Sequence, residues 1–150
     1  MMSNTPQGGR IVVGVDGSPS SRAALRWAIH QAKLTGATID AVTAWRMPAS
    51  YAWTQDGVTG IGDYPAEAQR ILTAAINELA GVDTDVKIRP LVEEGHPAQV
   101  LVEAAHGADL LVVGRRGHGG FSAALLGSVS QNCVHHAPCP VLVVRGNDAS

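Results

Sequence analysis

A glycine-rich stretch between an apolar run and a predicted helix is the feature that most constrains this chain. Residues 114–130 read GRRGHGGFSAALLGSVS and directly follow the apolar run LLVV. Gly114 and Gly117 can bring the backbone close to a ligand, because neither carries a Cβ atom. Ser128 and Gln131 fit a capping box, which predicts a helix N-terminus with spare N–H groups. Spare amides and the helix dipole attract anions, so this stretch predicts a phosphate site.

Strand-like and helix-like segments alternate along the rest of the chain. Runs rich in β-branched residues predict strands, and apolar residues at helical spacing predict helices. Predicted strands cover residues 11–15, 38–44, 86–92, 110–113 and 140–145, and predicted helices begin at Pro19, Pro65, His96 and Val129. This alternation predicts a doubly wound α/β domain, in which helices cover both faces of a parallel sheet through right-handed crossovers. The pattern alone leaves the order of the strands open.

The composition bounds the class of protein. A chain of 150 residues, 45% hydrophobic and 16% charged, has the size of one domain and can fill a core. Residues 10–146 are predicted to form this domain, with a disordered lead-in over residues 1–9 and a flexible tail over residues 147–150. The formal net charge of -2 lacks the basic excess of a nucleic-acid binder.

The sequence shows neither an export signal nor a membrane span. The first ten residues hold one basic residue and no apolar run, and no stretch reaches the length needed to cross a bilayer. We therefore expect a cytoplasmic protein, in which Cys133 and Cys139 are reduced. These cysteines lie close to His135 and His136, but the spacing is not that of zinc ligands, and no metal site is predicted.

The spacing of the glycine-rich stretch matches a known motif. Gly114, Gly117, Gly127 and Ser128 form G-x2-G-x9-G-S, which resembles the nucleotide-binding motif of the universal stress protein family, in its ATP-binding branch. The resemblance extends to VVGVDGS at residues 12–18, GHPAQVLVEAA at residues 95–105 and HAPCPVLVVR at residues 136–145. It implies a Rossmann-like fold of the adenine nucleotide alpha hydrolase type, with five parallel strands in the order 3-2-1-4-5. In that order the ligand crevice lies between strands one and four.

The candidate nucleotide site gathers at the carboxyl ends of the predicted strands. Asp16 could accept a hydrogen bond from a ribose hydroxyl or an adenine amine, or help to hold a metal ion. Alternatively, it is a turn residue that bonds the amides of Gly17 or Ser18. The resemblance implies ATP, with adenine between the ends of strands one and two, phosphates on the glycine-rich stretch, and Mg²⁺ ligands left open. The candidate residues are Val15, Asp16, Ala44, Val113, Gly114, Arg116, Gly117, Gly127, Ser128, Val129 and Ser130.

Catalysis is less strongly indicated than binding. Arg115 and Arg116 could place a guanidinium on a β- or γ-phosphate, or could simply be solvated. The sequence contains no G-x4-G-K-[ST] loop and no G-x-S-x-G elbow, and no residue stands out as a base for ATP hydrolysis. We expect a nucleotide-dependent regulatory protein of the stress response, with slow hydrolysis at most. Cyclic AMP as the ligand, a nucleotide-free partner-binding module and an ATP-consuming enzyme remain as alternatives.

Two further segments suggest interactions. Residues 45–64 hold four of the six aromatic residues and are expected to form a flap beside the site or a partner surface, or to shield the edge of the core. Bound nucleotide would order residues 114–128 and this flap. The last strand contains Val141, Leu142, Val143 and Val144, and the family order places it at the sheet edge. An apolar edge invites pairing, and the family commonly dimerises there, so a homodimer is expected.

Overall fold

Strands and helices alternate in the computed structural model, which describes residues 9–46, 64–81, 85–115 and 127–146. Within these ranges there are five strands and four helices. In chain order they are β1 (Arg10–Gly14), α1 (Pro19–Thr35), β2 (Thr38–Trp45), α2 (Tyr64–Ala80), β3 (Ile88–Glu94), α3 (Pro97–Ala104), β4 (Leu110–Gly114), α4 (Ser128–His136) and β5 (Val141–Val144).

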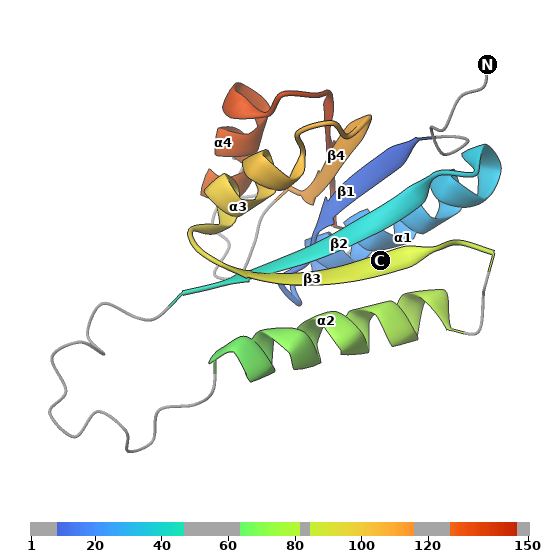
Figure 1. Cartoon of the computed structure of the whole chain (residues 1–150), viewed down its shortest axis with the longest axis horizontal. Coiled ribbons are helices and arrows are strands. Elements are labelled where there is room, and N and C mark those ends of the chain that lie inside the picture. The colour runs from blue at the N-terminus through green and yellow to red at the C-terminus, as the bar shows by residue number, and fades with distance from the viewer. Residues whose placement is uncertain (1–8, 47–63, 82–84, 116–126, 147–150) are drawn as a thin grey trace, which may run out of the picture.

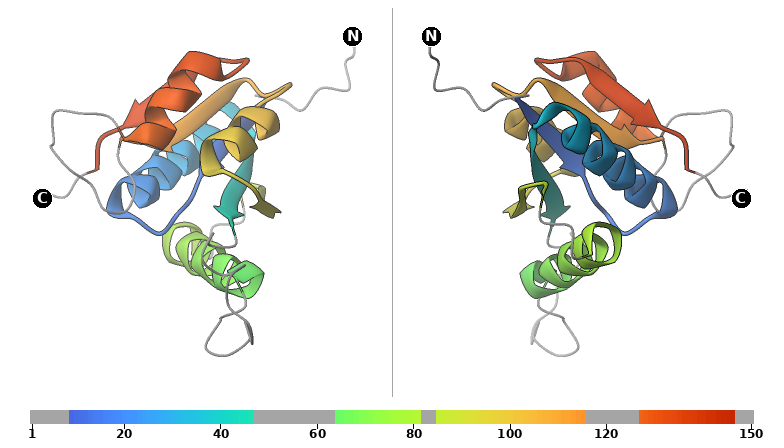
Figure 2. Two further views of the ribbon diagram at one scale, coloured as in Figure 1. Left: turned by 90° about the vertical axis from the view of Figure 1, so that its left-hand side faces the viewer. Right: turned by 90° about the vertical axis from the view of Figure 1, so that its right-hand side faces the viewer.

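The five strands form one parallel sheet in the order β3-β2-β1-β4-β5, which confirms the predicted fold. Helices α1 and α2 cover one face, and α3 and α4 cover the other (Figures 1 and 2). The chain leaves β1 toward β2 but leaves β4 toward β5, on the opposite side. The carboxyl ends of β1 and β4 therefore flank the point where the strand order reverses, the usual position of a ligand crevice in such sheets.

The core has two layers because each central strand is buried on both faces. In β1, Ile11 and Val13 pack under α1, whereas Val12 packs toward α3 and α4. The α1 layer is closed by Leu25, which is fully buried, and the opposite layer contains the buried side chain of Leu111. Strands buried on both faces read as continuous apolar runs, which explains why IVV and LLVV were strong strand signals.

Helix α1 begins and ends as its sequence predicts. Ser18 is the N-cap, and its hydroxyl accepts a hydrogen bond from the backbone N of Ser21 at 3.3 Å. Pro19 occupies the first helical position, where the missing N–H has no intrahelical partner to lose. Gly36 follows the helix with φ of 81°, a left-handed conformation that glycine adopts without strain. The signals at Ser18 and Pro19 fix where the chain enters the helix after β1, and Gly36 fixes where the helix ends.

Other boundaries differ from the predictions. Strand β3 runs from Ile88 to Glu94 rather than over residues 86–92, because its pairing with β2 begins at Ile39↔Ile88. The prediction of a capping box at Ser128 and Gln131 is also wrong. Helix α4 already includes Ser128, its N-cap is Gly127, and no side chain caps it.

A buried carboxylate links three strands near the amino-terminal end of the sheet. Asp40 in β2 is 3% exposed and accepts hydrogen bonds from Arg10 Nη1 at 2.8 Å and from Arg89 Nη2 at 2.9 Å. Burial raises the pKa of Asp40, but the hydrogen bonds and charges of Arg89 and Arg10 outweigh it, so the net pKa lies below its ordinary value of 3.8. The three side chains tie β1, β2 and β3 together at the end opposite the crevice.

Several predictions fall on parts of the chain outside the described residues. These are the lead-in apart from Gly9, the tail over residues 147–150, and residues 47–63 of the predicted flap. No helix within the described ranges combines the length and apolar character that a membrane span requires.

Candidate functional site

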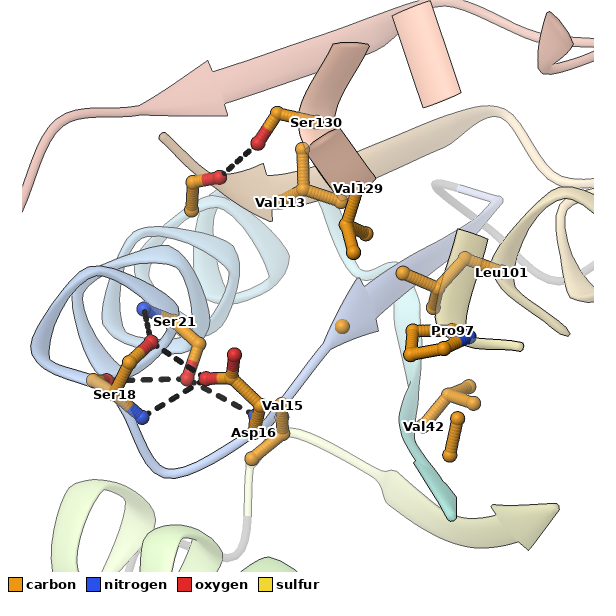
Figure 3. Close-up of a pocket in the computed structure, with 13 residues that line it drawn as sticks. Val15, Asp16, Ser18, Ser21, Val42, Pro97, Leu101, Val113, Val129 and Ser130 are labelled. Carbon is orange, nitrogen blue, oxygen red and sulfur yellow. Dashed lines mark hydrogen bonds between the residues drawn. The ribbon is translucent and has the colours of Figure 1, made fainter. Parts of the chain in front are cut away.

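A pocket opens at the carboxyl ends of β1, β2 and β4, where the strand order reverses (Figure 3). Seven of the eleven predicted site residues line it, namely Val15, Asp16, Ala44, Val113, Gly114, Val129 and Ser130. The other lining residues are Gly14, Ser18, Ser21, Val42, Pro97 and Leu101. Residues far apart in the sequence thus meet at one site because parallel strands end on the same side of the sheet.

One half of the pocket is apolar. Val42 and Ala44 come from the end of β2, while Pro97 and Leu101 come from the first turns of α3. Figure 3 shows Pro97 and Leu101 above Val42 on the same side of the pocket. A Cβ atom on Gly14 would lie 2.7 Å from Leu101 Cδ1, so the glycine in β1 lets α3 pack close to the sheet. An apolar part of a ligand could cover this half of the pocket, because burial of apolar surface away from water is favourable.

The opposite half is polar and is built on the turn between β1 and α1. Asp16 Oδ1 accepts hydrogen bonds from the backbone N of Ser18 at 2.9 Å and from its Oγ at 2.5 Å. The backbone N of Asp16 donates to Ser21 Oγ at 3.2 Å. Asp16 therefore holds the turn, as its alternative interpretation proposed, while it also lines the pocket.

The ends of β1 and β2 are joined by two hydrogen bonds to the backbone of Val15. Val15 lies just beyond β1, and its N–H donates to the carbonyl of Val42 at 2.8 Å. The buried hydroxyl of Thr43 donates to the carbonyl of Val15 at 2.9 Å. Both polar backbone groups of Val15 therefore have protein partners, so this residue offers the pocket its side chain.

Gly114 lies at the site for a reason other than the predicted one. A Cβ atom there would lie 2.5 Å from Ser20 Oγ and 2.6 Å from the Ser20 carbonyl carbon. The backbone of Gly114 also does not adopt a positive φ. The residue is small because the first turn of α1 packs directly on the end of β4, and this packing brings Ser18 and Ser21 to the pocket.

The first turn of α4 faces the same end of the sheet. The first intrahelical hydrogen bond runs from Gln131 N to Gly127 O at 3.0 Å, so the amides of Ser128, Val129 and Ser130 precede it. The N-cap, Gly127, makes no side-chain hydrogen bond to these amides. Amides at a helix N-terminus can bind an anion, and the helix dipole adds to the attraction.

The remaining predicted residues divide into two groups. Gly127 and Ser128 start α4 but are not among the pocket-lining residues, whereas Val129 and Ser130 are. Arg116 and Gly117 lie outside the described residues. Four other residues line the pocket but are not predicted from the sequence, namely Ser18, Ser21, Pro97 and Leu101. Ser18 had a signal, because the N-cap of the helix after β1 must lie at this end of the sheet.

The described cysteines and histidines do not suggest a second chemistry. Burial raises the pKa of the Cys133 thiol to about 11, which suits a core residue of α4 rather than a nucleophile. Within the described residues no group of three His, Cys, Asp or Glu side chains could hold a metal ion.

Comparison with known proteins agrees with this architecture. The model of the universal stress protein family matches residues 9–145. A universal stress protein of Mycolicibacterium smegmatis is 37% identical over 143 residues, an alignment that covers 90% of this chain and 45% of the relative. The chain thus spans a little under half the length of the curated relatives that it matches.

Solved structures show the same fold over most of their length. A universal stress protein in complex with cAMP is 31% identical with a TM-score of 0.68, covering 94% of this chain and 99% of that protein. UspA from Lactobacillus plantarum is 23% identical with a TM-score of 0.74, covering 93% and 99% respectively. Since the family model spans almost the whole chain and these structures share its fold, this chain belongs to the universal stress protein family.

Proposed function

We propose that this chain binds an adenine nucleotide, ATP in the first instance, in the pocket between β1, β2 and β4. The observation that carries the proposal is that backbone donors and an apolar surface meet at one pocket. The first turn of α4, whose N-cap Gly127 makes no side-chain hydrogen bond, offers amides to phosphates, and Val42 and Ala44 offer an apolar surface to a base. The relative solved with cAMP supports an adenine nucleotide as the ligand class.

The pocket chemistry suggests how the nucleotide would lie. The base would rest on the apolar half between the ends of β1 and β2. Asp16 would accept a hydrogen bond from a ribose hydroxyl or an adenine amine. The phosphates would reach the amides of Val129 and Ser130, with Gly127, Ser128, Arg116 and Gly117 as further contacts. Bound nucleotide supplies negative charge and hydrogen-bond acceptors to a region rich in backbone donors.

We propose regulation rather than catalysis as the outcome of binding. Among the described residues that line the pocket, Asp16 is the only carboxylate, and its Oδ1 already bonds Ser18. Activation of water for hydrolysis requires a base within reach of that water, so ATP turnover should be slow. The bound state would instead change a surface offered to a partner in the stress response. Amide exchange over residues 45–64 and 114–128 with saturating ATP tests this step, and unchanged exchange in both segments would refute it.

A homodimer through β5 is part of the proposal. The two edges of the sheet differ, because β3 carries Pro90 and the exposed side chains of Arg89 and Glu93, whereas β5 consists of VLVV. Charges and proline on an edge strand discourage pairing, and an uncharged apolar edge favours it. The second copy would therefore add to β5 and leave β3 open to solvent.

Calorimetric titration with ATP, ADP, AMP and cyclic AMP tests the proposed function. Wild-type protein should bind, and Gly117→Ala should bind more weakly because the added methyl group crowds the phosphates. Leu34→Ala is the matched control, since Leu34 lies at the far end of α1 and is 70% exposed. Its affinity should equal that of the wild type.

The relative affinities for the four nucleotides distinguish the alternative functions. Preference for cyclic AMP over ATP would make the cyclic monophosphate the ligand of the same pocket. Failure of all four nucleotides to bind would refute the proposal and favour the partner-binding function. ATP consumption at rates typical of enzymes, with or without magnesium, would replace regulation by catalysis.

A further inference from the structure

The hydroxyl of Ser130 joins the two ends of the glycine-rich stretch. Ser130 is 2% exposed and lies in the first turn of α4. Its Oγ donates to the carbonyl of Gly114 at 2.5 Å and also approaches the carbonyl of Arg115 at 3.1 Å. Figure 3 shows this side chain turned from α4 toward the end of β4. The contact spans sixteen residues of sequence, so it is a tertiary link between a strand and a helix.

This hydroxyl is poorly placed to donate to a phosphate. A serine hydroxyl has one hydrogen, and here it is directed at two backbone carbonyls. Turning it toward a ligand would leave the carbonyl of Gly114 without this partner in a part-buried position, which is unfavourable. Ser130 can still offer its backbone N–H to an anion, because that amide precedes the first intrahelical bond of α4.

The end of β4, whose carbonyls accept from Ser130, is itself fixed by neighbouring elements. The backbone N of Arg115 donates to Val144 O at 2.8 Å, and the carbonyl of Arg115 accepts a bond from Gly127 N at 2.8 Å. Gly114 is packed against Ser20 of α1. The end of β4 is therefore fixed to β5 and α1, and it can serve as the reference against which α4 is placed.

We propose that Ser130 is a positioning residue, whose hydroxyl holds the first turn of α4 against the end of β4 and so aims the amides of that turn at the pocket. The effect on ligand affinity rests on the proposed nucleotide binding. The effect on the ligand-free protein does not. Ser128 provides the contrast, since it lies in the same turn and is exposed, and the N-cap of the helix is Gly127 rather than Ser128.

Amide hydrogen exchange without ligand tests the position of the turn. In Ser130→Ala the Gly127 amide, which donates to Arg115 O, should exchange about tenfold faster or more, because the loss of one hydrogen bond corresponds to roughly that factor. Ser130→Thr keeps the hydroxyl and should stay close to the wild type. Ser128→Ala should leave Gly127 exchange unchanged. A circular dichroism melt of each variant confirms that the domain is folded.

Affinity for ATP and for adenosine completes the test. Ser130→Ala should weaken ATP binding about tenfold and leave adenosine binding nearly unchanged, because adenosine has no phosphates for the α4 amides. If Ser130→Ala weakened ATP binding while Gly127 exchange stayed at the wild-type rate, the hydroxyl would be a direct donor and the proposal would be wrong. Unchanged exchange together with unchanged affinity would also overturn it. If wild-type protein bound no nucleotide, the proposed function would fail, and the exchange experiment alone would still decide the role of Ser130.

Discussion

Gly114 at the end of β4 lies directly against Ser20 in the first turn of α1, with no room for a side chain between them. The contact places the turn that carries Asp16 and Ser18 beside the strand that leads into the glycine-rich stretch. One close approach of a helix to a strand thus brings together the polar half of the pocket and the start of the glycine-rich stretch.

Gly114→Ala should therefore destabilise the fold itself. The added methyl group would meet the Ser20 backbone, which cannot move without shifting α1, and overpacking of this kind costs about 1–3 kcal/mol. Gly14→Ala should cost less, because its methyl group meets the flexible end of Leu101. Urea unfolding of both variants measures the free energies. Equal stability of Gly114→Ala and the wild type would show that α1 does not depend on this contact.

Asp16→Asn should separate the two roles of Asp16. Asparagine keeps an oxygen that can accept the bonds from Ser18, so the melting temperature should change little. It loses the negative charge that a ribose hydroxyl or adenine amine would meet, so ATP affinity should fall about tenfold. Calorimetry and a thermal melt on the same preparation check both statements. A large loss of stability with unchanged affinity would assign Asp16 to the turn alone.

Asp40 should make the protein sensitive to acid. Its pKa in the folded state lies below the unfolded value of 3.8, so its contribution to stability is present above that value and is lost as the pH falls through the folded pKa. Asp40→Asn should lower stability at pH 7, by less than the about 3–5 kcal/mol of a fully buried pair, because Arg89 reaches solvent.

Asp40→Asn should also make the free energy of unfolding less dependent on pH. Urea unfolding of wild type and Asp40→Asn between pH 7 and pH 3 should show the two stabilities converging as the pH falls. The exposed pair Glu67 and Arg70 on α2 supplies the control. Glu67→Gln should run parallel to the wild type over the same range. A constant difference between wild type and Asp40→Asn would contradict the assignment of a lowered pKa.

Val143→Pro should separate the proposed dimer from the fold. The carbonyls of Pro140 and Val144 accept bonds from Leu111 and Arg115 of the β4 side, so the backbone groups of Val143 point to the open edge. Proline there removes an outward N–H while the β4 pairing remains. Sedimentation at micromolar concentration should show a dimer for the wild type and for Val143→Ala, and a monomer for Val143→Pro. A monomeric wild type would refute the dimer.

Local chemistry explains which parts of the fold the sequence predicts well. Ser18, Pro19 and Gly36 mark helix α1 because capping and backbone conformation depend on neighbouring residues. The start of β3 was misplaced because Val86 is buried like a strand residue, although the ladder with β2 begins at Ile88. The strand order came from the family resemblance, and the structure confirms it.

The site was only partly predictable for a physical reason. Its turn and its glycine-rich stretch carry local signals, so Asp16 and Ser130 could be found. Pro97 and Leu101 reach the pocket because Gly14 lets α3 approach β1, and this tertiary contact leaves no local pattern. Gly114 lines the pocket, but its contact with Ser20 could not be read from the sequence, because glycine serves close packing as readily as it serves a ligand.

Nuclear magnetic resonance of isotopically labelled protein during an ATP titration shows directly whether the nucleotide binds in this pocket. Saturable shifts are expected for the backbone amides of Val129 and Ser130 in α4 and of Asp16 after β1. Amides at the opposite end of the sheet, such as that of Asp40, should stay in place. Saturable shifts confined to other surfaces, or no shifts at millimolar ATP, would contradict nucleotide binding in this pocket.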